Sequence, residues 1–92
     1  MNFGQAVEAL KEGKRAARTG WNGKAMWLAL TQGSTIASGD ARSGATLKLA
    51  ETGVSEITIC PHIDMKAADG TIVIGWLASQ TDMLANDWVI LQ

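Results

Sequence analysis

The chain has 92 residues, of which 47% are hydrophobic and 18% charged, and its formal net charge is −1. This length and composition predict one globular domain over residues 1–92, whose small core would gain from association with further copies. The charge argues against broad nucleic-acid binding, although residues 1–24 hold five Lys or Arg against two Glu and could meet a small anion. Neither a membrane span nor a signal peptide is visible, and a lone cysteine indicates a reducing, intracellular setting.

The first predicted element is a helix over about residues 3–12. Asn2 and Gln5 have the spacing of a capping box, and apolar residues follow at helical period. Gly13 is suited to the left-handed position that ends a helix. We therefore expect an N-terminal helix with one apolar face turned toward the rest of the domain.

Two strands are predicted next, over residues 14–19 and 25–31. Asn22-Gly23 between them is a strong signal for a tight hairpin. Residues 33–53 are rich in Gly, Ser and Ala and are interpreted as a long loop.

The second half of the chain predicts more strands. Residues 56–60 and 63–67 are interpreted as one strand region interrupted near Pro61, which cannot donate to a ladder. Asp69-Gly70 predicts a type I′ turn, after which residues 71–76 return as the partner strand.

A short helix and a last strand complete the predicted fold. Ser79 begins the helix, which extends through Ala85, and Asp82 supplies an acidic version of the capping box. Residues 87–91 form the final strand. The fold class is therefore α+β: an N-terminal helix packed on a mostly antiparallel β-sheet, with a second short helix near the C-terminus.

Residues suited to catalysis are few. His62 has no second His or Cys at metal-ligand spacing, so a structural or surface role is favoured, although a couple with Cys60 on one strand face is conceivable. Asp82 and Asp87 form a carboxylate pair, but one can cap a helix and the other can be a surface acid. The sequence predicts no catalytic residues, no metal site and no cofactor.

Residues suited to binding are better represented, especially in "IGWLASQTDMLANDWVIL". Indole rings stack on bases, and the start of a short helix offers N–H groups to a phosphate beside Ser79, Gln80 and Thr81. An alternative remains open, in which Trp76 and Trp88 bracket the short helix and attach it to the sheet as core residues.

Two blocks, "ARTGWNGKAMWLAL" and "WLASQTDMLANDWVIL", resemble the phage-encoded Thoeris anti-defence proteins of the second type. "NFGQAVEALKEGKRAAR" and "MKAADGTIV" extend the resemblance over about residues 1–31 and 60–91. It implies a sponge that binds cyclic ADP-ribose isomers made by TIR-domain proteins without cleaving them. Some family members also hold cyclic dinucleotides at a separate site. The resemblance further implies a homo-oligomer, typically a tetramer, in which each pocket is shared between two protomers. It also implies that the protein acts in the cytoplasm of the infected bacterium. It implies neither a nucleic-acid polymer nor a membrane as partner.

Carried over by motif, the resemblance implies base stacking by Trp21 and Trp76 and polar contacts by Asn22. It implies contacts to ribose or phosphate for a further set in the short helix: Ser79, Gln80 and Thr81. Asp82 either caps the helix or holds a ribose hydroxyl. Trp88 is assigned to the core.

Asn86 departs from the family pattern, because relatives often have an acid just before Asp-Trp. Its amide can read a base edge, so the preference among cyclic nucleotides could differ here. Two other functions remain open at this point: an enzyme that degrades the same signal, and a phage structural or assembly module without a small ligand.

Overall fold

The computed structural model describes residues 1–22 and 24–91. The chain divides into two compact units, one formed by Met1–Thr31 with His62–Gln92 and the other by Gln32–Pro61. Among the described residues, no helix combines the length and the apolar character needed to cross a membrane.

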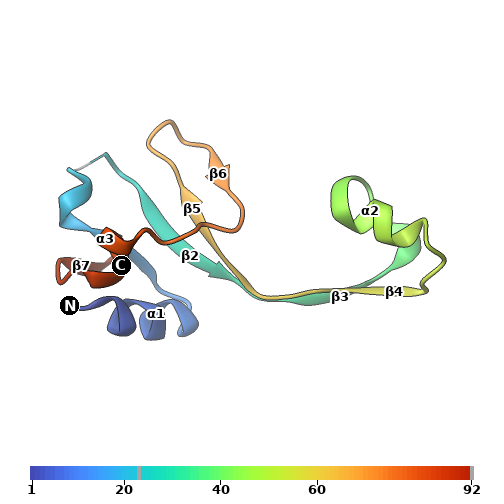
Figure 1. The fold of residues 1–92 in the computed structure, drawn as a ribbon, viewed down its shortest axis with the longest axis horizontal. Helices are drawn as coiled ribbons and strands as arrows, with labels where there is room; N and C mark the ends of the chain where they lie inside the picture. The colour runs from blue at the N-terminus through green and yellow to red at the C-terminus, as the bar shows by residue number, and fades with distance from the viewer. Residues whose placement is uncertain (23, 92) are drawn as a thin grey trace. The chain divides into compact units, whose positions relative to one another are not determined.

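The first unit contains a five-stranded sheet with the strand order β6-β5-β2-β1-β7 (Figure 1). Every neighbouring pair is antiparallel. β1 lies between β2 and β7 and joins the two ends of the chain, because it pairs with β2 on one side and with the C-terminal β7 on the other. The strands are β1 Arg15–Arg18, β2 Trp27–Thr31, β5 His62–Lys66, β6 Ile72–Val73 and β7 Trp88–Leu91.

The N-terminal helix α1 covers Phe3–Lys11, as predicted. The side chain of Asn2 accepts a hydrogen bond from the backbone N–H of Gln5 (2.8 Å), and the Gln5 side chain accepts one from the backbone of Asn2 (2.9 Å). Both bonds of the predicted capping box are present. Gly13 follows the helix with φ of 87°, which confirms its left-handed conformation.

The core lies between α1 and one face of the sheet, where α1 packs on β1, β2 and β7 (Figure 1). Trp88 is the largest side chain in it and is only 1% exposed, so its predicted core role is confirmed. The core cluster consists of Ala6, Leu10, Ala16, Leu28 and Trp88. Small alanines on α1 and β1 let the helix approach the sheet closely enough for Trp88 to fill the space between them.

The predicted tight hairpin between the first two strands is wrong in its detail. β1 and β2 are antiparallel neighbours, with Ala16 opposite Leu28. A short 3-10 helix, η1 Thr19–Trp21, follows β1, and Asn22 then adopts the left-handed conformation with φ of 58°. Gly23 lies outside the described residues. The chain thus leaves the ladder at Arg18 to form a wider connection, which positions Trp21.

The turn between β5 and β6 also differs from the prediction. A type I′ turn needs positive φ at both central residues, but Asp69 is not among the described non-glycine residues with positive φ, whereas Gly70 has φ of 92°. The Gly70 N–H bonds the Ala67 carbonyl and the Ala67 N–H bonds the Thr71 carbonyl. These bonds describe a type I turn followed by a left-handed glycine. The returning strand is only Ile72–Val73, shorter than predicted.

The second short helix is confirmed. α3 covers Gln80–Leu84, and Ser79 caps it by accepting the Asp82 N–H at 3.1 Å. Asp82 completes the capping box through its carboxylate. With the N-terminal helix and the antiparallel sheet, this helix confirms the predicted α+β fold class.

The prediction of a long loop over residues 33–53 is wrong. Within the second unit, two strands form an antiparallel hairpin in which Ile36 is opposite Ile57. A 3-10 turn and a helix connect the strands. The elements are β3 Ser34–Ala37, η2 Ser38–Asp40, α2 Gly44–Ala50 and β4 Glu56–Ile59. The region predicted as one interrupted strand around Pro61 is therefore two strands, β4 and β5, in different sheets.

Replacing Leu28 with Ala should lower the free energy of unfolding by about 2–5 kcal/mol, since it leaves a cavity in a tightly packed core. Leu28 is 0% exposed, whereas Leu49 in the second unit is 44% exposed. Urea denaturation of Leu28→Ala should show this loss, and the matched control Leu49→Ala should show much less. Equal losses in the two variants would contradict the assigned core.

Candidate functional site

The candidate site is built around an aromatic cluster. The Trp21 and Trp76 rings lie 6.4 Å apart between centroids, at an interplanar angle of 70°. Both also meet Trp88 edge to face, Trp21 at 5.4 Å and Trp76 at 6.3 Å. Phe3 from α1 closes the cluster beside Trp76 and Trp88. Edge-to-face packing of this kind is favourable beyond the area it buries, so Trp88 supports the two half-buried rings in fixed orientations.

Arg18, at the end of β1, binds two carboxylates from distant parts of the chain. Its Nε donates to Asp87 Oδ1 at 2.8 Å, and its Nη1 donates to Asp82 Oδ1 at 2.8 Å. The Arg18 and Asp82 side chains are 15% and 14% exposed, and Asp87 is 31% exposed. Charge-assisted bonds in such a shielded place are stronger than surface ion pairs. They connect the end of β1 to α3 and to the residue before β7.

The same carboxylates also hold the turn that carries Trp21. Asp87 Oδ2 accepts the Gly20 backbone N–H at 2.7 Å and the Thr19 hydroxyl at 3.3 Å. Asp82 Oδ1 accepts the Trp21 indole N–H at 3.4 Å. The position of Trp21 therefore depends on both acids, although only Asp82 contacts its ring nitrogen.

Arg18 favours the ionised form of both acids. Its hydrogen bond is the largest cause that lowers the pKa of Asp87 to about 2, together with the bonds from Gly20 and Thr19 and against the opposing effect of burial. Burial raises the pKa of Asp82, but the bonds from Arg18 and Ser79 outweigh it and hold the pKa below its usual range. Both acids are therefore carboxylates at neutral pH, and both act as acceptors.

A buried acid, Asp64 on β5, fixes the segment that leads to Trp76. It is 7% exposed and accepts the Gly75 backbone N–H at 2.9 Å. Its other partners are the Thr31 hydroxyl and His62, whose Nδ1 lies 2.7 Å from Asp64 Oδ1. Burial raises the pKa of Asp64, but these hydrogen bonds outweigh it and the pKa is lowered. The Trp76 backbone N–H donates to the Ile63 carbonyl on β5 at 2.7 Å, so the segment before this ring is fixed as well.

His62 accordingly has a partner that the sequence did not indicate. A strand places residues 62 and 64 on one face, and Asp64 occupies the Nδ1 side of the ring. The structure thus gives this histidine a role in holding a buried carboxylate, in line with the structural role favoured from sequence.

The predicted site residues divide into two groups. Trp21, Trp76, Ser79 and Asp82 are brought together through the aromatic cluster and the α3 cap. Asp82 does cap the helix, and its carboxylate also accepts the Ser79 hydroxyl at 2.9 Å. The other predicted residues are exposed at the surface: Asn22, Gln80, Thr81 and Asn86. Sequence reasoning missed Arg18 as the partner of both acids, because Arg18 lies more than 60 positions from either of them.

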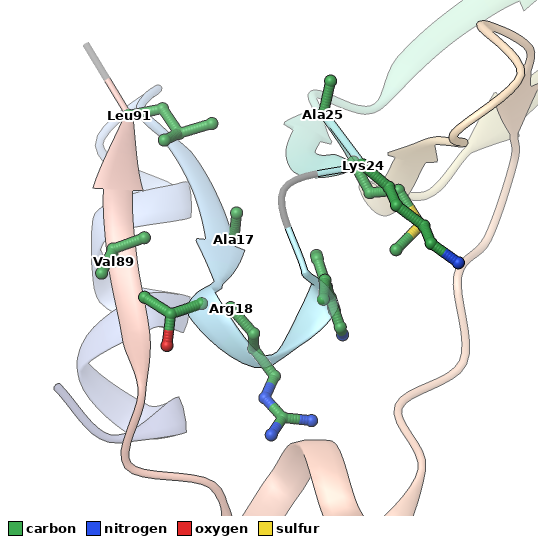
Figure 2. Close-up of a pocket in the computed structure, with 9 residues that line it drawn as sticks. Ala17, Arg18, Lys24, Ala25, Val89 and Leu91 are labelled. Carbon is green, nitrogen blue, oxygen red and sulfur yellow. The ribbon is translucent and has the colours of Figure 1, made fainter.

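A pocket of about 250 Å³ opens beside Trp21 on the sheet. Ala17, Val89 and Leu91 project into it from neighbouring strands, and Lys24 and Ala25 form the opposite wall (Figure 2). These strand residues alternate with Ala16, Trp88 and Ile90, so they belong to the sheet face turned away from the core. The pocket is mainly apolar, and its lining includes two basic residues, Arg18 and Lys24.

Ala25 in the pocket wall has an uncommon backbone conformation, with φ of 57°. A left-handed conformation costs a residue with a side chain about 1–2 kcal/mol. The Lys66 ammonium donates to the Ala25 carbonyl at 3.0 Å and helps to hold it.

Comparisons with known proteins agree over the whole chain. The model of one family, described as the Thoeris anti-defense 2-like domain, matches residues 1–91. The protein named Thoeris anti-defense 2 from Bacillus phage SP01 is 42% identical over 91 residues, which cover 99% of this chain and 94% of that protein.

Gly20 lies where a side chain would disturb the ion pair between Arg18 and Asp87. A Cβ atom there would lie 2.8 Å from Asp87 Oδ2 and 3.1 Å from Arg18 Nη2. We expect Gly20→Ala to lower the free energy of unfolding by about 1–3 kcal/mol, as overpacking does. Gly39→Ala is the matched control, because a Cβ atom at Gly39 would meet no described residue beyond its chain neighbours within 4 Å. Denaturant titrations of the two variants should separate them, and equal stability would contradict the close approach.

Acid should weaken the fold through Asp87. Its pKa is about 2 in the folded chain and about 3.9 when unfolded, so the unfolded state binds the proton first. The stabilisation is present above the unfolded pKa and is lost as the pH falls through the folded pKa. Urea midpoints between about pH 4 and pH 2 should therefore fall less steeply for Asp87→Asn than for the wild type, with Asp40→Asn in the second unit as control. Identical slopes for wild type and Asp87→Asn would refute this role.

Proposed function

The chain belongs to the Thoeris anti-defense 2-like family, and from this membership we propose that it counteracts the Thoeris defence of bacteria by sequestering its nucleotide signal. The ligand is a cyclic ADP-ribose isomer made by a TIR-domain protein, which the chain holds without cleaving in the cytoplasm of the infected host. Cyclic dinucleotides are a further candidate ligand. The observation that carries the proposal is the pair of half-buried indoles, Trp21 and Trp76, held in fixed orientations at the surface.

Stacking on such rings would supply the recognition of a base. A base on an aromatic side chain contributes about 1–3 kcal/mol, and a ring that is already fixed loses little freedom when the ligand arrives. Trp21 meets Trp76 and also lines the pocket beside Lys24. A nucleotide could therefore place its base against an indole and its negative charge near a cation. Asn22 and Asn86, both exposed, would add polar contacts at the edge.

The α3 start is less suited to phosphate than its sequence suggested. The Asp82 carboxylate already occupies the cap and lies within bonding distance of the Ser79 hydroxyl. An arriving phosphate would meet this negative charge. We therefore assign Ser79, Gln80 and Thr81 to ribose hydroxyl groups and expect Lys24 to meet the phosphate.

Exposed apolar residues beside the site support a pocket completed by a second protomer. Ile74, Leu77 and Leu84 are 67%, 90% and 77% exposed. Large exposed apolar side chains are typical of interaction faces. A chain of this size cannot enclose a nucleotide alone, so we propose a homo-oligomer, a tetramer in the family pattern, with shared pockets.

The acid and base groups near the site support binding without cleavage. Asp82 and Asp87 accept bonds from Arg18, and their lowered pKa values make them poor proton donors at neutral pH. A general acid needs a pKa near the working pH, and Asp82 and Asp87 instead serve as hydrogen-bond acceptors for Arg18.

Incubation with a cyclic ADP-ribose isomer, followed by heat denaturation, tests the proposal directly. We expect calorimetry to show binding and the supernatant to contain the intact ligand. Linear ADP-ribose in the supernatant would identify an enzyme that degrades the signal. No binding of any cyclic ADP-ribose or cyclic dinucleotide would favour a structural or assembly module.

Trp21→Ala and Trp76→Ala should each weaken ligand binding by about 1–3 kcal/mol, or roughly 5- to 150-fold, through the loss of a stacking face. The matched control is Trp27→Ala, since Trp27 stacks with Arg15 at 5.4 Å outside the aromatic cluster. Circular dichroism and native mass spectrometry must show folded variants in the wild-type assembly. Unfolding of both variants, or wild-type binding by both, would mean that these rings serve only the core.

A further inference from the structure

Arg18 lies outside the hydrophobic core cluster, yet it connects three parts of the site. Its guanidinium reaches from the end of β1 toward α3 (Figure 2), where it bonds Asp82, and its other edge bonds Asp87 through Nε at 2.8 Å and Nη2 at 3.4 Å. A planar guanidinium can hold two carboxylates in fixed directions at once, which an ammonium cannot.

Each carboxylate also holds part of the segment that contains Gly20 and Trp21. Asp87 holds the Gly20 backbone and Asp82 holds the Trp21 indole N–H. Without the guanidinium, two partly buried negative charges would share the space with no counterion, and one would turn toward water. The bonds to Gly20 and Trp21 would be lost with that movement.

We propose that Arg18 is a positioning residue, which fixes the Trp21 ring of the ligand-binding wall through Asp87 and Asp82. Its importance for binding rests on the proposed function, whereas its effect on Trp21 does not. Arg18 also lines the pocket, so direct contact with an anionic ligand is the competing role.

Two measurements without ligand test the positioning. In Arg18→Gln and in Asp87→Asn, the indole N–H resonance of Trp21 should shift, and the Gly20 amide should exchange with solvent faster than in the wild type. Arg42→Gln and Asp40→Asn, at exposed positions of the second unit, are the matched controls. Wild-type resonance and exchange in both test variants would overturn the proposal, whether or not a ligand binds.

Ligand affinity then separates positioning from direct contact. We expect Arg18→Gln and Asp87→Asn to weaken binding of a cyclic ADP-ribose isomer by similar factors, about ten- to a hundredfold. Arg18→Lys should lie between wild type and Arg18→Gln, because it keeps the charge but not the planar fork. If Arg18 contacts the phosphate directly, Asp87→Asn frees it and binding is retained or strengthened, which would overturn the proposal.

If Arg18→Gln does not fold, Asp87→Asn and Arg18→Lys still decide the question through the Trp21 indole resonance and the Gly20 amide exchange. Absence of binding by the wild-type protein would refute the proposed function alone, and the Trp21 resonance and Gly20 exchange would still decide the role of Arg18.

Discussion

The arrangement of the first unit depends on the burial of Trp88. Its indole fills the space between α1 and the sheet, and its N–H donates to the Asp82 carbonyl at 3.0 Å. Its backbone carbonyl accepts the Met1 ammonium at 2.9 Å. One side chain thus fixes the helix, the sheet and α3 together, which a small core needs because it has few large residues to share this role.

Two polar clusters add to the packing of Trp88 by fixing the segments next to the surface indoles. Arg18 with its acids fixes the segment that carries Trp21, and Asp64 with Thr31 and His62 fixes the segment before Trp76. Both surface indoles are therefore packed against Trp88, and a carboxylate holds the Trp21 ring nitrogen and another holds the backbone before Trp76. Such a wall is rigid before any ligand arrives, so association would lose little conformational entropy.

Sequence predicted the parts of the fold that local rules control. The two capping boxes and the last strand were found because their signals lie within a few residues of one another. The hairpin of β3 and β4 was missed because its short, polar strands gain their stability from cross-strand pairs such as Ile36 with Ile57. In the candidate site, the indoles and Asp82 could be named from motifs. The bond from Arg18 to Asp87 could not, because it depends on β1 pairing with β7, a contact between the two ends of the chain.

The left-handed Ala25 has a consequence for how the pocket could vary between relatives. Glycine would remove its strain of about 1–2 kcal/mol but would give the unfolded chain additional freedom worth roughly 0.5–1 kcal/mol. The difference favours glycine by only about 0.5–1 kcal/mol, so folding places a weak constraint on the choice between these residues. Selection at this position can therefore follow the shape of the ligand, and the pocket wall is a place where new binding preferences could evolve at small cost to the fold.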